Sequence, residues 1–127
     1  MIKVLLAEDD INLRNLICKH LNKEGYETKE VLDGEEAVNE FFNNKYDLIV
    51  LDMMLPKMSG IEVCANIKQQ SNVPIIMINA KSMEYERLIK SKCGADKYIK
   101  KPFSIEVFLF KVNIVLWLEK LKIKCNP

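Results

Sequence analysis

The sequence has no close pair of cysteines, no long apolar run and no large excess of charge. Its four cysteines lie far apart, whereas a zinc site or a redox motif requires close spacing. We expect reduced thiols in a cytoplasmic protein. The net charge of +1 does not indicate a nucleic-acid-binding surface. No apolar run approaches the roughly 20 residues of a membrane span, and acids directly after the apolar start argue against a signal peptide.

Internal repeats, low-complexity stretches and linkers are also absent from the 127 residues, which suffice for one domain with a real core. Hydrophobic residues make up 49% and charged residues 29%, a balance typical of a globular protein. We therefore expect one domain over residues 1–122. Residues 123–127 are expected to be a tail or the start of a linker.

Short apolar runs alternate with segments of helical spacing along the chain. The runs at 2–7, 46–51 and 73–78 indicate buried strands, and weaker patterns indicate strands at 26–31 and 97–100. Helices are predicted at 12–23, 35–43, 60–70 and 82–93, and from an N-cap at Ser104 to about residue 122. Five such alternations predict an α/β fold, with a parallel sheet and helices on both of its faces.

Polar side chains follow four of the predicted strands at the point where each strand ends. They are Glu8 and Asp9, Asp52, Asn79, and Lys101. Because parallel strands end at the same edge of a sheet, these side chains are expected to meet where such sheets bind ligands.

Three acids in one pocket repel one another unless a cation offsets their charge. A site made only of oxygen ligands suits Mg²⁺. Lys101 adds a fixed positive charge beside it. An aspartate in such surroundings can act as a nucleophile and form an acyl phosphate. The grouping therefore points to phosphoryl chemistry at Asp52.

Five stretches of the chain resemble the receiver domains of two-component response regulators, most closely those of the winged-helix transcription-factor subfamily. They are Glu8-Asp9, Leu51-Asp52-Met53-Met54-Leu55-Pro56 with Gly60, Pro74-Ile75-Ile76-Met77 before Asn79-Ala80, Gly94-Ala95-Asp96 with Tyr98, and Lys101-Pro102-Phe103-Ser104. The resemblance covers essentially the whole chain. It implies a flavodoxin-like, doubly wound three-layer fold of five βα units, with the strand order 2-1-3-4-5.

The same resemblance implies roles for the residues at the sheet edge. Asp52 would be the phosphoryl acceptor, and Lys101 would pair with the phosphoryl oxygens. Asp9 and Asp52 would be side-chain ligands of Mg²⁺. The backbone carbonyl of Met54 would be a third ligand, and Glu8 would act through water.

The resemblance also implies partners. The phosphoryl donor would be a phosphohistidine of a sensor histidine kinase, and His20, the only histidine here, is not that donor. The output is expected to be transcriptional, with DNA bound only through an output domain outside this stretch of chain. No membrane association is expected.

Two features depart from the family pattern. The family usually has Thr or Ser where this chain has Asn79, and that hydroxyl couples the phosphoryl group to a switch aromatic, here Tyr98. Asn can still donate a hydrogen bond through its amide. In the winged-helix subfamily, salt bridges pair two receivers across the face of helix 4, strand 5 and helix 5, yet this chain has Lys97, Lys111 and Val107 at charged positions of that network.

The last predicted helix carries apolar residues on two sides. One set is expected to face the sheet: Phe108, Leu109, Val112, Val115 and Leu116. A second set forms another stripe: Val107, Phe110, Ile114, Trp117, Leu118 and Leu121. Such a stripe can be partly core and partly scattered surface, since exposed apolar residues are normal. A contiguous apolar stripe on an outer helix more often marks a partner surface. We therefore predict a homodimer or partner contact through Phe110, Ile114 and Trp117.

Other functions are weighed against this one. A phosphatase with an aspartyl-phosphate intermediate commonly has a second Asp two residues after the nucleophile, where this chain has Met54, so an enzyme is not expected. A flavin module would need a Ser-, Thr- and Gly-rich phosphate loop after the first strand, where the acids would repel a phosphate. The remaining alternative is a degenerate receiver that acts as a constitutive interaction module.

Overall fold

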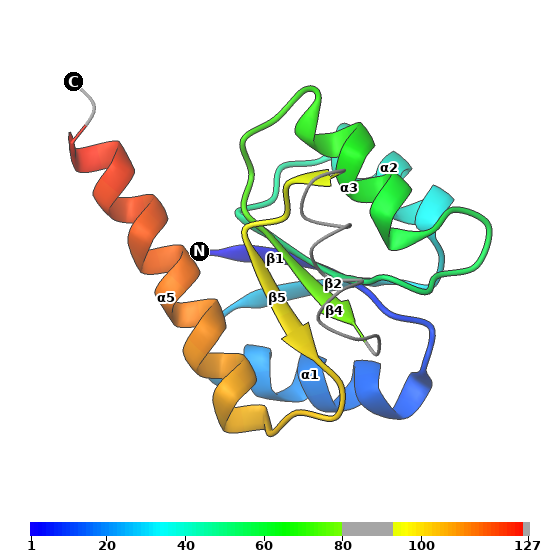
Figure 1. Cartoon of the computed structure of the whole chain (residues 1–127). Coiled ribbons are helices and arrows are strands. Elements are labelled where there is room, and N and C mark those ends of the chain that lie inside the picture. The colour runs from blue at the N-terminus through cyan, green and yellow to red at the C-terminus, as the bar shows by residue number, and fades with distance from the viewer. Residues whose placement is uncertain (80–92, 126–127) are drawn as a thin grey trace.

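The structure is a computed structural model that describes residues 1–79 and 93–125 (Figure 1). Its strands form one parallel sheet in the order β2-β1-β3-β4-β5. The strands are β1 (Lys3–Ala7), β2 (Glu27–Val31), β3 (Leu48–Asp52), β4 (Ile75–Asn79) and β5 (Lys97–Lys100). The described helices are α1 (Ile11–Lys23), α2 (Gly34–Asn43), α3 (Gly60–Lys68) and α5 (Ile105–Cys125). The predicted α/β class and strand order are confirmed, while the helix predicted at 82–93 lies outside the described residues except for Cys93.

Helices cover both faces of the sheet and make three layers (Figure 1). Successive residues of a strand point to opposite faces. In β1, Leu5 and Ala7 belong to the core shared with α2 and α3, whereas Val4 and Leu6 belong to the core shared with α1 and α5. Each central strand therefore contributes to two cores, which explains why its sequence is continuously apolar.

The position of each strand in the sheet follows its composition. β3 and β4 are buried along their whole length, and β1 is buried except at its first residue. β2 lies at one edge, as its weak apolar alternation predicts, and only Val31 in it is buried. β5 forms the other edge, with both of its end residues exposed.

Side-chain caps begin the helices close to the strand ends. Asp10 accepts hydrogen bonds from the amides of Asn12 and Leu13 at the start of α1. Asp33 and Ser59 cap α2 and α3 in the same way, and the predicted cap Ser104 accepts from the Val107 amide at 3.2 Å. These caps fix short turns at the carboxyl edge, and thereby the residues within them.

α5 packs on the sheet through one side only. The buried residues on that side are Phe108, Val112, Val115 and Leu116, as predicted, with Leu109 partly buried. The exposed apolar residues of the helix include Val107, Phe110, Trp117 and Leu118. The helix continues to Cys125, beyond the predicted end near residue 122. Among the described residues, no helix is both long and apolar enough to cross a membrane.

Candidate functional site

The candidate site lies where β1 and β3 end side by side. β1 leads to β2 on one side of the sheet and β3 leads to β4 on the other, so the strand order reverses between them. Open α/β sheets bind ligands at such a reversal. Ala7 pairs with Leu51, which brings the next residues of the two strands, Glu8 and Asp52, to the same level at the edge.

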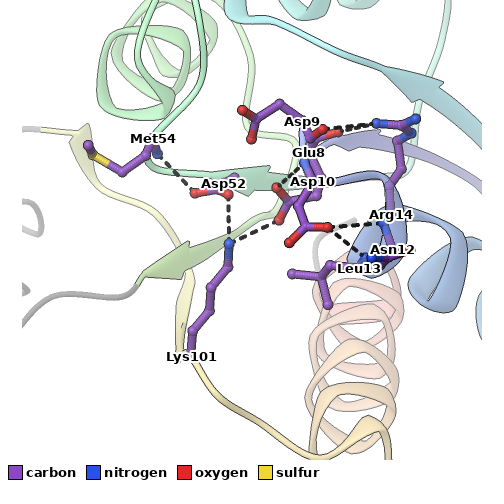
Figure 2. A network of polar contacts seen from close by, with 9 residues as sticks. All are labelled: Glu8, Asp9, Asp10, Asn12, Leu13, Arg14, Asp52, Met54 and Lys101. Atoms are coloured by element: carbon purple, nitrogen blue, oxygen red, sulfur yellow. Dashed lines mark hydrogen bonds and ion pairs between the residues drawn. The ribbon is translucent and has the colours of Figure 1, made fainter.

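Lys101 lies between the two acids (Figure 2). Its Nζ is 2.8 Å from Asp52 Oδ2 and 3.2 Å from Glu8 Oε1. The Lys101 amide donates to the Asn79 carbonyl at 2.8 Å, which fixes the residue just beyond β4 and β5. Partial burial lowers the pKa of Lys101, but the hydrogen bond and charge of Asp52, together with the charge of Glu8, outweigh this effect and raise it. The ammonium is therefore held charged at the site.

Backbone amides hold the remaining oxygens of both acids. Asp52 Oδ1 accepts from the Met54 amide at 2.9 Å, and Glu8 Oε2 accepts from the Asp10 amide at 3.1 Å. Asp52 is 4% exposed and Glu8 is fully buried. Burial is the main cause that raises the pKa of Glu8 to about 7, and the neighbouring charge of Asp52 adds to it. Burial and the Asp52 carboxylate therefore outweigh the lowering effects of the Asp10 amide and of Lys101 on this pKa.

The carboxylates of Glu8, Asp9 and Asp52 form a group that fits a metal ion. One oxygen from each lies within 4.8 Å of the others, and Asp9 is exposed while the other two are buried. Glu8 Oε1 is buried and accepts no hydrogen bond among the described residues, so that its contact with Lys101 is an ion pair only. Clustered carboxylates with one side open to water suit Mg²⁺, which keeps several water ligands.

Two residues that the sequence reasoning missed support this group of acids. Arg14 Nη1 donates to the Glu8 carbonyl at 2.9 Å (Figure 2). The Nε of Arg14 lies 3.5 Å from Glu30 Oε1. Asp10 caps α1 and its amide holds Glu8. An Asp just before a helical pattern is a signal for a cap. The contact of Arg14 with the Glu8 carbonyl could have been predicted only from the position of an arginine in the helical turn that follows the acids.

The loop after Asp52 is packed tightly against the start of the next helices. The Gly60 amide donates to the Met53 carbonyl at 2.9 Å, and the Gly34 amide donates to the Pro56 carbonyl at 3.1 Å. A Cβ at either glycine would collide with backbone, that of Asp52 and Met53 at position 60 and that of Met58 at position 34. The loop therefore holds Met54 in place above Asp52.

Asn79 and Tyr98 are both buried, but in different surroundings. Asn79 ends β4 beside the site and is 1% exposed. Tyr98 in β5 points inward and belongs to the core that contains Cys64 and Cys93. Burial, and then the charge and hydrogen bonding of Cys93, raise the pKa of Tyr98. In this structure the Tyr98 side chain therefore lies inside the core.

The residues predicted to form an interface lie on the outward side of α5. Phe110, Ile114 and Trp117 line a shallow groove that also includes Ile2, just before β1, and Tyr26, just before β2. On the other flank of the helix, Leu118 and Leu121 line a second groove with Lys97, the first residue of β5, and with Asp96 before it. The apolar stripe therefore borders two different grooves, and helix 4 of the predicted face lies outside the described residues.

A five-stranded parallel sheet in this order, with an acidic cluster and a lysine at its carboxyl edge, is the architecture of a phosphoacceptor receiver. Residues 4–113 match the response regulator receiver domain family. The chain belongs to this family, which confirms the resemblance noted in the sequence.

Similar sequences and solved structures are also those of response regulators or their receiver domains. The response regulator ArlR of Staphylococcus aureus (strain Mu50) is 40% identical over 116 residues, covering 91% of this chain and 53% of that protein. The chain therefore spans about half the length of this relative. The receiver domain of the Francisella response regulator 1452 is 36% identical, with a TM-score of 0.87 and coverage of 94% of this chain and 99% of that one. The response regulator TrrA of Thermotoga maritima, solved in complex with Mg(2+)-BeF, is 35% identical, with a TM-score of 0.81 and coverage of 91% and 99%.

Proposed function

We propose that this receiver domain is a phosphorylation-controlled switch in which Asp52 accepts a phosphoryl group from a phosphohistidine of a sensor histidine kinase. A carboxylate oxygen of Asp52 attacks phosphorus, the phosphorus–nitrogen bond of the donor breaks, and the electron pair leaves with the imidazole. The observation that carries the proposal is the 2.8 Å ion pair of Asp52 with Lys101 at the sheet edge. The ammonium is placed to stabilise negative charge on the transferred group.

The acids beside Asp52 support a Mg²⁺ site. Asp9 and Asp52 would bind the ion through their side chains, Met54 through its backbone carbonyl, and Glu8 through water. The chemistry supplied by a bound ion is neutralisation of the charge that collects around the phosphoryl oxygens. Two observations support this assignment: the three carboxylates approach one another closely, and the buried Glu8 Oε1 accepts no hydrogen bond among the described residues.

Asn79 and Tyr98 are proposed to carry the response. Asn79 would donate its amide to the phosphoryl group in place of the usual hydroxyl. Because an amide is bulkier than a hydroxyl and cannot move in the same way, its coupling to Tyr98 is expected to be altered. We infer that Asp52 is still phosphorylated but that the conformational response differs from the family pattern.

The proposed role in signalling depends on two partners, a sensor kinase and an output domain or protein. A cytoplasmic sensor kinase domain would supply the phosphoryl group, and the output, through an attached domain or a partner, would be control of transcription, with DNA bound by that output domain. We assign residues 1–122 to the receiver and 123–127 to a tail or linker. The chain acts as a switch rather than an enzyme, and its partner surface includes Phe110, Ile114 and Trp117.

A second candidate is a degenerate receiver that acts as a constitutive interaction module. The observations that favour it are Asn79 at the hydroxyl position and the exposed apolar side of α5. This alternative predicts the same fold and the same partner surface, but no phosphoryl transfer to Asp52.

Incubation with Mg²⁺ and acetyl phosphate, followed by intact-mass measurement, separates the two candidates. We expect one phosphoryl group on the wild-type chain and none on Asp52→Asn or in the presence of a chelator. Asp47→Asn, at an exposed acid before β3, is the matched control and should be modified like wild type. A wild-type chain that stays unmodified at every phosphodonor concentration would favour the degenerate receiver.

A further inference from the structure

The outward side of α5 carries a regular apolar stripe directly opposite the core. Phe110, Ile114 and Trp117 each follow a buried core residue of the same helix by two positions. Two positions turn an α-helix by about 200°. The stripe therefore faces away from the sheet, and Phe110 and Trp117 are 66% and 59% exposed.

The spacing of the stripe is that of a helix-pairing seam. Its members are Val107, Phe110, Ile114, Trp117 and Leu121. The intervals between them are 3, 4, 3 and 4 residues, which is the heptad pattern of two helices packed side by side. A stripe made by chance on a solvated surface has no reason to keep this alternation over two heptads.

α5 also extends beyond the part of the sheet on which it packs. Among the α5 side chains that the structure describes, the last buried one is that of Leu116. From Trp117 to Lys122 every side chain is exposed or only partly buried. Figure 1 shows the C-terminal half of the helix running past the sheet. A projecting helix that is apolar on its solvent side lacks the second surface that such helices normally pack against.

The charges beside the seam complement those of a second copy. With Val107 and Phe110 in the seam, Glu106 and Lys111 occupy the two flanking positions that pair across parallel coiled helices. Glu106 of one copy would face Lys111 of the other, and the two-fold axis makes this contact twice. Lys111 Nζ already donates to the Tyr98 carbonyl at 3.1 Å and keeps two more protons for such a pair.

Grooves on both flanks give the stripe the form of a ridge. The groove beside Ile2 and Tyr26 has a volume of about 440 Å³, and the groove beside Asp96 and Lys97 has a volume of about 400 Å³. The Tyr26 hydroxyl donates to the Asn113 side chain and fixes one wall. Helices pack by setting the ridge of one into the groove of another.

We propose that this ridge pairs with the same ridge of a second copy of the chain, α5 against α5 in parallel about a two-fold axis. The seam is the outward stripe from Val107 to Leu121, and the specificity comes from Glu106 and Lys111. The proposal rests on the partner surface proposed above and names its occupant. It does not require phosphorylation of Asp52, so a failure of phosphoryl transfer would not affect it.

Trp117 is the only tryptophan of the chain and therefore reports directly on the seam. Sedimentation velocity and tryptophan emission, measured together over a range of concentrations on the unphosphorylated full chain, test the pairing. We expect a dimer at high concentration, with emission shifting to the blue as Trp117 leaves water. A chain that stays monomeric with constant emission at all concentrations would overturn the proposal and leave the stripe to a different partner.

Variants test which residues form the seam. Phe110→Asp should abolish the dimer while circular dichroism shows an intact fold, because the side chain is exposed in the single chain. Phe42→Asp, at an exposed aromatic of α2, is the matched control and should dimerise like wild type. An equal loss of dimer in Phe110→Asp and Phe42→Asp would contradict a seam on α5.

Charge reversal tests the parallel arrangement. Glu106→Lys and Lys111→Glu should each weaken the dimer, and the double variant should recover much of the lost affinity. A double variant weaker than either single one would overturn the pairing of Glu106 with Lys111. Because Asp52→Asn leaves the seam intact, that variant should dimerise normally, and failure of phosphorylation would not affect this result.

Discussion

Gly60 packs so closely on Asp52 that a Cβ atom at position 60 would collide with the Asp52 carbonyl oxygen and lie 2.8 Å from Met53 Cα. The first residue of α3 thus rests on the backbone of the proposed phosphoacceptor. The position of the Asp52 backbone therefore depends on the close packing of Gly60 against it.

Gly60→Ala should therefore impair both stability and phosphorylation. Relief of the collision requires a backbone shift, for which we expect a loss of about 1–3 kcal/mol in the free energy of unfolding. Urea denaturation and the rate of modification by acetyl phosphate measure the two effects. Gly25→Ala is the control, because alanine is strained at the positive φ of this position, which is remote from Asp52. An unchanged phosphorylation rate in Gly60→Ala would contradict the role of this contact.

Mg²⁺ should stabilise the folded chain through the acidic cluster. At a Mg²⁺ concentration about a hundred times the dissociation constant, binding to the folded state alone contributes about 2.7 kcal/mol. Thermal unfolding with and without Mg²⁺ measures this gain, and Asp9→Asn should remove most of it. In Asp10→Asn the cap of α1 is kept, since Asn caps as well as Asp, so the gain should remain. If both variants respond equally, Asp9 is not a ligand.

Lys101→Gln should slow phosphorylation without weakening Mg²⁺ binding. The substitution removes the ammonium that lies beside Asp52 and Glu8, and the loss of such a group costs roughly a hundredfold in rate. Loss of a positive charge beside the acids should leave Mg²⁺ affinity equal or higher. Lys100→Gln, at an exposed position of β5, is the control. Similar rates for both variants would exclude a special role for Lys101.

Asn79→Thr should leave phosphorylation of Asp52 possible but change the response. A threonine restores the hydroxyl that the family uses, so both the lifetime of the phosphorylated state and the NMR signals of Tyr98 should differ from those of the parent chain. Asn72→Thr, at an exposed position before β4, is the matched control. Identical lifetimes and Tyr98 signals in Asn79→Thr and the parent would refute altered coupling.

The sheet was predictable from the sequence because the buried strands are marked by composition alone. β3 is apolar up to Asp52, and a strand covered on both faces leaves no room for polar residues until it ends. The same reasoning brought Glu8 and Asp52 together, since parallel strands end at one edge. It also separated the two sides of α5, because the period of a helix divides core-facing from outward residues.

Contacts that depend on register and on loop conformation were not predictable. The sequence placed Lys101 at the edge, but its position between two carboxylates depends on how β5 aligns with β4. The collision that forbids a side chain at Gly60 depends on the path of the preceding loop. The contact of Arg14 with the Glu8 carbonyl likewise requires the turn that Asp10 caps. Such contacts join segments whose spacing in the sequence carries no periodic signal.

The central claim is that Asp52 accepts a phosphoryl group, and chemical mapping of the modified residue tests it most directly. The chain is incubated with Mg²⁺ and acetyl phosphate, the acyl phosphate is reduced with borohydride, and the peptides are sequenced by mass spectrometry. Reduction converts a phosphorylated aspartate to homoserine and leaves unmodified carboxylates unchanged. We predict homoserine at position 52, dependent on Mg²⁺. Homoserine at position 9 or 10 instead, or at no position, would contradict the account.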